Sequence, residues 1–419
     1  MILPNLRHLC AALEIKRLGS ITRAAETVNL SQPAITQGIR NLEKELGFKL
    51  FTRSHEGLQT TELGIIFLHR AERAVTFLYD ARPLFLPSHR NNTLLMRLLT
   101  TGQLRAVMTV ADRGSYTVAA KQLKVTQPTV SRAVKDVERL CRFSLFSKAE
   151  SGVEASPQAR RLARCISLFF TELAQGWEDV QHYSGKPTGE LRIGSLPLSR
   201  TSIVPLAVIS LVKVFPEANV SIIEGPYEEQ LSALLQGKLD VIVGALRSPS
   251  PDSAIVQRPM FTDELSVVMK RGHRLDTAKE ISTQALQQLE WVAPRKETPA
   301  REAFRGFFAR FQLEEPTKII ESSSLIATRA LLMSSERLAL LSRRQVDIDV
   351  QYGLLSVRPQ KLPGTERQIG ISYRRKWQPT KIQQEFLSTL EQSFCDAMNE
   401  FGVWQDSSTL QPQKARLFT

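Results

Sequence analysis

The feature that most constrains this chain is an internal repeat. The stretch AAETVNLSQPAITQGIRNLEKELGFKLF at 24–51 returns as AAKQLKVTQPTVSRAVKDVERLCRFSLF at 119–146. The offset is 95 residues throughout, as between Ser20 and Ser115 (115 − 20 = 95), and no gap interrupts it over residues 9–57 of the first copy. A repeat of this kind predicts two copies of one folded module.

The first copy has the pattern of a helix-turn-helix. Residues 28–30 form the turn, and Ser31 suits the N-cap of the next helix because its hydroxyl can accept from an unpaired amide. Pro33 falls in the first turn, where a missing N–H costs little. Apolar residues then recur at three- and four-residue steps from Ile35 to Leu46, which predicts one buried face and one polar outer face.

The outer face and its counterpart supply the candidate nucleic-acid contacts. Glutamine can bond adenine edges, arginine a guanine or a phosphate, and alanine or threonine a thymine methyl group. The remaining polar residues would fix register on phosphates. After each helix a short two-stranded wing is expected, over residues 48–51 and 58–60 in the first copy. The DNA-contacting residues expected are Ser31, Gln32, Pro33, Ala34, Thr36, Gln37, Arg40 and, on the wing, Arg53, and in the second copy Thr126, Gln127, Pro128, Thr129, Ser131, Arg132, Lys135 and Lys148.

Both copies resemble the winged helix-turn-helix of LysR-type transcriptional regulators. The family signature is close to A-A-x-x-L-x-x-S-Q-P-A-x-S-x-x-I-x-x-L-E-x-x-L-G-x-x-L-F-x-R, and the first copy departs from it little. The second copy has Cys141 and Arg142 where the family has Leu-Gly, and Lys148 where it has Arg. Family members normally carry one such module and this chain has two. Which copy reads DNA, or whether one is only a dimerising spacer, stays open.

A long helix is expected after each wing. Thr60 or Thr61 caps the first, which runs to about residue 81, and Ser156 caps the second, with Pro157 at its first position. The resemblance implies that such linker helices pair across a dimer, which gives an inverted-repeat DNA site. The second helix has an apolar stripe from Leu162 to Trp177 that predicts a dimer surface, and the alternative is packing on the chain's own C-terminal domain.

From residue 189 the pattern changes to strands alternating with helices, which predicts a parallel α/β sheet. This part resembles the two-lobed effector domain of LysR-type regulators, which is similar to periplasmic solute-binding proteins. The expected fold is therefore multidomain: two all-α winged helix-turn-helix modules followed by a two-lobed α/β domain. The expected boundaries are 1–81, 94–184 and 189–402, with lobe one at 190–257 and 366–402, lobe two at 258–365, and a loose tail at 405–419.

Polar residues follow three of the expected strands. Open α/β sheets bind ligands beyond the carboxyl ends of their strands, and helix N-termini favour anions. Together with the resemblance this predicts a small anionic effector in a cleft between the lobes. A sugar, a sugar acid or an aromatic acid would each suit a polar cleft of this kind. The cleft residues expected are Ser195, Leu196, Ser199, Thr201, Ser202, Arg247, Arg295, Thr298, Ser322 and Ser323, with the Ser and Thr residues at 199–202 also able to cap the next helix.

Charge and cysteine usage agree with a DNA-binding protein. The net charge is +13, of which residues 1–184 carry 25 − 16 = +9, so the basic excess accompanies the repeat as phosphate binding requires. The four cysteines lack metal-ligand spacing and fit buried thiols, so neither a metal nor a cofactor is expected. No apolar run approaches a membrane span and the start lacks a signal-peptide layout, which favours the cytoplasm.

The sequence therefore predicts a regulator rather than an enzyme. It has no Gly-rich phosphate loop, no H-E-x-x-H and no G-x-S-x-G. The expected partners are double-stranded promoter DNA, a small-molecule effector and further copies of the chain in a homodimer or homotetramer joined by the linker helices. RNA polymerase is a further candidate partner. The alternative is an architectural or repressor protein that binds DNA without an effector.

Overall fold

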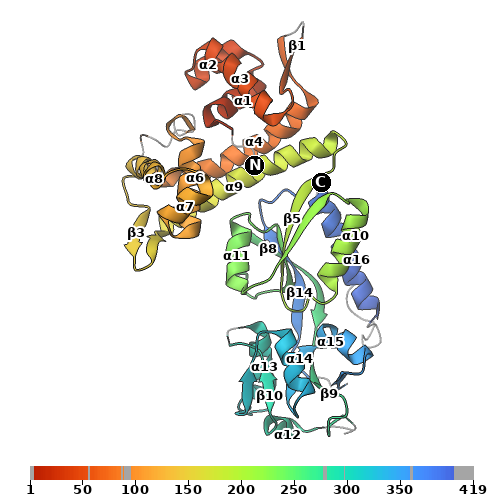
Figure 1. The fold of residues 1–419 in the computed structure, drawn as a ribbon. Coiled ribbons are helices and arrows are strands. Elements are labelled where there is room, and N and C mark those ends of the chain that lie inside the picture. The colour runs from red at the N-terminus through yellow and green to blue at the C-terminus, as the bar shows by residue number, and fades with distance from the viewer. Residues whose placement is uncertain are drawn as a thin grey trace.

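The computed structural model describes residues 4–54, 57–85, 88, 96–276, 281–296, 298–358 and 362–400. It has two small helical modules, a pair of long helices, and an α/β domain of two lobes (Figure 1). The expected wing tip at 55–56, the start of the second copy at 94–95 and the tail at 405–419 lie outside the described residues.

The first module has three helices and a two-stranded wing: α1 (Leu6–Leu18), α2 (Ile21–Val28), α3 (Gln32–Leu46), β1 (Phe51–Ser54) and β2 (Gly57–Thr60). The cap expected at Ser31 is confirmed, since its hydroxyl accepts from the Ala34 amide at 3.4 Å. The wing strand begins at Phe51 and not at residue 48. The amides of Leu50 and Phe51 both donate to the buried Glu43 carboxylate, which holds residues 48–50 against α3 before the strand can begin.

The second module repeats this arrangement with α6 (Thr101–Arg113), α7 (Tyr116–Leu123), α8 (Gln127–Cys141), β3 (Phe146–Ala149) and β4 (Gly152–Ala155). Arg142 ends α8 in the left-handed region at φ 58°, where Gly47 ends α3 at φ 83°. Glu138 accepts from the Leu145 amide, as Glu43 does in the first copy. The departures from the signature therefore leave the backbone of the module unchanged, although Arg142 holds a conformation that favours glycine.

The long helices α4 (Glu62–Asp80) and α9 (Pro157–Tyr183) lie side by side within one chain (Figure 1). Arg70 of α4 bonds Asp179, near the end of α9, whereas Arg161 near the start of α9 bonds the Asp80 carbonyl, so the helices are antiparallel. This corrects the expectation that the apolar stripe from Leu162 needs a second chain. Its residues from Leu162 to Leu173 are buried against α4 and neighbouring elements of the same chain, and Trp177 is partly buried. A short 3₁₀ turn, η1 (Arg82–Leu84), follows α4.

Lobe one is a five-stranded sheet in the order β6-β5-β7-β14-β8. Its strands are β5 (Gly189–Ser195), β6 (Ala218–Ile223), β7 (Val241–Ala245), β8 (Ile255–Asp263) and β14 (Arg367–Arg374), and its helices are α10 (Ile203–Val214), α11 (Tyr227–Leu235) and α16 (Lys381–Glu400). The sheet is mixed and not parallel, because β14 runs antiparallel to both β7 and β8. β8 keeps the chain in this sheet to Asp263, beyond the expected change of lobe at residue 257.

Lobe two has a second mixed sheet in the order β11-β10-β12-β9-β13. Its elements are β9 (Leu265–Lys270), α12 (Thr283–Gln287), β10 (Trp291–Ala293), α13 (Pro299–Ala309), β11 (Ile319–Glu321), α14 (Leu325–Met333), β12 (Leu338–Ser342), α15 (Arg343–Gln351) and β13 (Leu355–Val357). The strands β8 and β13 and the helix α15 were not expected from the sequence. Each lobe has its own apolar cores, whereas both helical modules and the long helices share one.

Candidate nucleic-acid interface and effector site

The two recognition helices present their polar faces to solvent. Ile35, Ile39, Leu42 and Leu46 of α3 are buried, as the stripe predicts. The expected contact residues lie on the opposite face, where Ser31, Gln32, Pro33, Ala34, Gln37, Arg40, Arg53, Thr126, Gln127, Pro128, Thr129, Arg132, Lys135 and Lys148 are exposed and Thr36 and Ser131 are partly exposed. Each module thus brings its set together on one surface, with Arg53 and Lys148 on the wing strands β1 and β3.

Some of these side chains have local partners and others do not. Thr36 donates to the Gln32 carbonyl, and Gln37 donates to Asn41. By contrast, Arg40, Arg132 and Lys135 have no carboxylate within 4 Å among the described residues. Exposed cations without a protein partner are available to phosphates and base edges.

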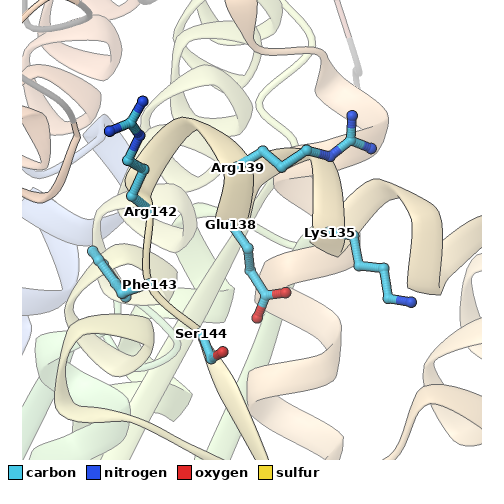
Figure 2. Close-up of a pocket in the computed structure, with 6 residues that line it drawn as sticks. All are labelled: Lys135, Glu138, Arg139, Arg142, Phe143 and Ser144. Atoms are coloured by element: carbon cyan, nitrogen blue, oxygen red, sulfur yellow. The ribbon is translucent and has the colours of Figure 1, made fainter.

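A hollow at the C-terminal end of α8 extends the basic surface of the second module (Figure 2). It is lined by Lys135, Glu138, Arg139, Arg142, Phe143 and Ser144. Figure 2 shows the guanidinium of Arg142 and that of Arg139 extending away from the helix end. The sequence named only Lys135 here, because the turn was treated as a departure from the signature and not as a source of cations.

The expected capping role of the residues after β5 is wrong. Ser195 and Ser199 are fully buried and hydrogen-bond each other at 3.0 Å. Ser199 also donates to the Leu196 and Val243 carbonyls, so it closes the turn and caps no helix. Ser202 stands at the N-cap of α10 without a side-chain bond. Leu196 is buried, and its side chain packs against Gly244.

Thr201 instead connects the two lobes. Its hydroxyl lies 3.2 Å from the Arg344 carbonyl at the start of α15 and 3.3 Å from the Leu198 carbonyl. The lobe-two residues lie at the expected strand ends. Thr298 caps α13 by accepting from the Arg301 amide, Ser322 bonds Ser324, and Arg295 and Ser323 are exposed. The chain therefore places these residues on both lobes, and among the described residues no hydrogen bond joins the expected residues of one lobe to those of the other.

Arg247 has the most informative surroundings of the expected effector residues. Its guanidinium carbon lies 4.0 Å from the centre of the Tyr227 ring, on the first turn of α11. Burial lowers the pKa of Arg247, and Tyr227, Glu228 and, from lobe two, Glu302 raise it. The Tyr227 hydroxyl and Gln230 Oε1 are buried without a partner among the described residues. Both residues were missed from the sequence because nothing in the pattern of α11 distinguishes them from core positions.

Comparisons with known proteins decide what kind of protein this is. A model described as the LysR substrate binding domain matches residues 184–395, and a model for the bacterial regulatory helix-turn-helix protein of the lysR family matches twice, at 6–65 and 101–160. The chain belongs to the LysR family. The two helix-turn-helix matches are again 95 residues apart (101 − 6), and each LysR match coincides with a part of the fold described above.

Relatives of this LysR regulator are themselves regulators and not enzymes. The HTH-type transcriptional regulator GalR of Pseudomonas putida is 31% identical over 372 residues, which cover 89% of this chain and 93% of the relative. PcaQ of Agrobacterium fabrum is 24% identical over 71% of this chain and 94% of its own length. Because the GalR match leaves only 419 − 372 = 47 residues of this chain unaligned, it must include parts of both helix-turn-helix copies.

Solved structures support the same fold. A full-length OxyR variant from Pseudomonas aeruginosa superposes with a TM-score of 0.53 at 22% identity, covering 71% of this chain and 94% of that one. ArgP from Mycobacterium tuberculosis superposes with a TM-score of 0.55 at 14% identity, covering 70% of this chain and 96% of that one. In the described part of this LysR chain no helix is long and apolar enough to cross a membrane, and no three His, Cys, Asp or Glu side chains are grouped to hold a metal ion.

Proposed function

We propose that this LysR-type regulator binds promoter DNA in the cytoplasm through α3 and α8 and controls transcription in response to a small anionic metabolite. The observation that carries the DNA-binding part is the pair of recognition helices, each capped by Ser or Thr, with Arg40, Arg132 and Lys135 exposed and unpaired among the described residues. A helix with this outer face fits the major groove. RNA polymerase is a candidate partner at such promoters.

Charge reversal at equivalent positions tests this proposal. Arg40 and Lys135 are counterparts (135 − 40 = 95), and we expect Arg40→Glu and Lys135→Glu each to weaken binding to the promoter of the protein's own gene about 10- to 100-fold, since each replaces an attraction to phosphate or base by a repulsion. Footprinting across a salt series measures both the loss of affinity and the part of the promoter that each variant no longer protects. Lys318→Glu, an exposed change just before β11 in lobe two, is the matched control and should leave the footprint intact. Unchanged binding by both variants would contradict the assignment of the recognition helices.

The anionic effector follows from Arg247 and Tyr227. Both lie beyond the carboxyl ends of the lobe-one strands, at the first turn of α11, where the helix dipole favours negative charge. A carboxylate between the guanidinium and the orphan hydroxyl would accept from both, and Gln230 Oε1 would accept from a hydroxyl group of the same ligand. A sugar acid or an aromatic acid suits this set better than a neutral sugar, because the anion satisfies the arginine.

Tyr227→Phe separates a binding role from a packing role. A buried hydroxyl without a partner costs about 1–3 kcal/mol, so its removal should leave thermal stability unchanged or raise it by about 1 kcal/mol. The stabilisation by a bound acid should fall, because one donor is lost, and Arg247→Ala should abolish it. Thermal shifts over a panel of carboxylates and their neutral amides give the readout. Equal shifts in Tyr227→Phe and the unaltered chain would exclude Tyr227 from the site.

A direct contact connects the effector domain to the DNA-binding half. The segment between β14 and α16 accepts two bonds from α4: Arg70 Nη1 donates to the Gln378 carbonyl at 2.7 Å, and Arg73 donates to the Lys376 carbonyl at 2.6 Å. On the side of the second module, Lys238 pairs with Asp112 at 2.6 Å. A change in lobe one on effector binding would therefore shift α4, and with it the first module.

Oligomers, which we also propose, would form through the effector domain, since α4 and α9 are occupied by each other. Helix α10 exposes Leu206 and Ile209, each more than half accessible, and the edge strand β6 exposes Ile222 and Ile223. Contiguous exposed apolar side chains of this kind favour contact with another protein surface. A homodimer built there carries four winged helix-turn-helix modules.

A further inference from the structure

The antiparallel pair of α4 and α9 relates the two modules by an approximate two-fold axis. The helices are equivalent elements of the two copies, and equivalent helices that pair in opposite directions are exchanged by a two-fold rotation. Glu62 at the start of α4 bonds Tyr183 at the end of α9, and Arg70 bonds Asp179 at 2.8 Å. Gly176 permits this close approach, because a Cβ there would lie 2.8 Å from that of Arg70.

A second contact between equivalent elements lies where the first helices of the modules begin. Thr101, the first residue of α6, donates to the Pro4 carbonyl at 2.6 Å, just before α1. Arg7 of α1 donates to the Arg97 carbonyl at 3.0 Å, just before α6. Thr101 is the counterpart of Leu6 (101 − 6 = 95), so the same end of each module meets the other. The buried residues of both modules and of the helix pair form one continuous core.

These contacts fix the position of the two recognition helices relative to each other within one chain. In a two-fold protein dimer, the symmetry places two identical readers on two half-sites of opposite orientation. Here the covalent repeat provides that arrangement without a second chain, because the surface that would hold two chains together is already buried between α4 and α9.

The two readers are not identical. Their outer faces agree at Gln32/Gln127 and Pro33/Pro128. Apart from the caps Ser31 and Thr126, the expected contact residues of the helices differ at Ala34/Thr129, Thr36/Ser131, Gln37/Arg132 and Arg40/Lys135. Glutamine and arginine prefer different bases, since glutamine pairs with adenine and arginine with guanine, and threonine replaces alanine where a thymine methyl group would be contacted. The two half-sites should therefore differ in sequence.

We propose that one chain reads a non-palindromic DNA site, made of two unlike half-sites in opposite orientation, as the intramolecular equivalent of a dimer. This rests on the proposed DNA binding and departs from the inverted repeat expected from the sequence. It assigns α3 to one half-site and α8 to the other, with one protein chain per pair of half-sites.

The test is selection of binding sites from random DNA by the full chain, with the mass of the complex measured on the shortest site. The decisive variant is Ala34→Thr/Thr36→Ser/Gln37→Arg/Arg40→Lys, which gives α3 the expected DNA-contacting residues of α8 beyond its cap. We expect the unaltered chain to select two unlike half-sites and the variant to select an inverted repeat of one of them, with a preference of at least about tenfold over the original site. At saturation the complex should hold one pair of half-sites per chain, so a homodimer joined through the effector domains should bind two copies of the site.

The converse variant, Thr129→Ala/Ser131→Thr/Arg132→Gln/Lys135→Arg, is the matched control and should yield an inverted repeat of the other half-site. All eight positions are exposed or partly exposed, so neither variant disturbs the core. A palindromic site selected by the unaltered chain, or two chains required on one pair of half-sites, would overturn this inference while leaving DNA binding established. No salt-sensitive binding by the unaltered chain would instead refute the proposed function, and this inference with it.

Discussion

Arg70→Ala is expected to lower the free energy of unfolding by about 3 kcal/mol, because it leaves Asp179 and the Gln378 carbonyl without their donor and leaves the buried Glu172 with Arg73 alone. Arg70 is 2% exposed, and its guanidinium binds Asp179 at 2.8 Å and Glu172 at 3.3 Å on α9 and the Gln378 carbonyl on the effector domain. One side chain therefore joins α4, α9 and lobe one. Urea unfolding followed by tryptophan fluorescence measures the loss, since Trp177 and Trp377 lie close in sequence to the groups that Arg70 binds.

Arg17→Ala is the matched control for this change. Arg17 also forms an ion pair, with Glu14 at 2.7 Å, but its side chain is 62% exposed, so its removal should change stability by less than about 1 kcal/mol. A second variant, Arg70→Met with Glu172→Gln, removes the cation together with one buried charge and should recover part of the stability. Equal effects of Arg70→Ala and Arg17→Ala would show that the cluster is solvated and does not hold the three parts together.

The repeat made the modules predictable in detail. Caps, turns and apolar stripes depend on residues close in sequence, so Ser31, Ser156 and the face from Ile35 to Leu46 were placed correctly. In the effector domain most strands and helices were also found, because alternation of the two patterns is a local signal. The strand directions were not predicted correctly, because whether β14 runs parallel or antiparallel to β7 depends on how the chain returns from lobe two.

The partner of the linker helices could not be read from their stripes. A stripe predicts that a face is buried and does not say what covers it. One signal was present where the sequences of the two copies differ. The first helix has Arg70 where the second has the apolar Cys165, and the second has the acids Glu172 and Asp179. A charge in an apolar stripe of one copy and opposite charges in the other indicate that the two copies face each other.

The effector residues were only partly predictable, for a related reason. Ser195 and Ser199 follow a strand as ligand-binding residues do, but they satisfy each other and the backbone of their own turn. Tyr227 and Gln230 fit core positions of α11, and their orphan polar atoms become visible only when every neighbouring donor and acceptor is placed. Arg247 was predicted because a charge just after a buried strand is unusual enough to be noticed in the sequence, and its role in effector binding stays a prediction.

Glu178 near the end of α9 couples stability to pH. Its carboxylate lies where the helix meets the start of β5: Oε1 accepts from the Glu190 amide at 3.3 Å, and Oε2 is buried without a partner among the described residues. Burial is the main cause that raises the pKa of Glu178 to about 8. The negative charges of Asp240 and Glu190 raise this pKa further, whereas the bond from the Glu190 amide and the charge of Arg192 lower it. The folded protein therefore prefers this side chain neutral, whereas the unfolded chain ionises it near pH 4.5.

Glu178→Gln should consequently make the protein more stable in alkali and leave it nearly unchanged in acid. Because the folded pKa is the higher one, the stability from the neutral carboxyl is complete below about pH 4.5 and is lost as the pH rises toward 8. At about 1.4 kcal/mol per pKa unit, that loss is at most about 5 kcal/mol.

Glutamine keeps an acceptor for the Glu190 amide and cannot ionise, so the stability advantage of the variant should grow between about pH 5 and 8 and then level off. Urea midpoints at about pH 5, 7 and 9 measure the difference. Parallel curves for both proteins over that range would mean that solvent reaches Glu178, and that the junction of α9 with the effector domain is open enough to hydrate a charge.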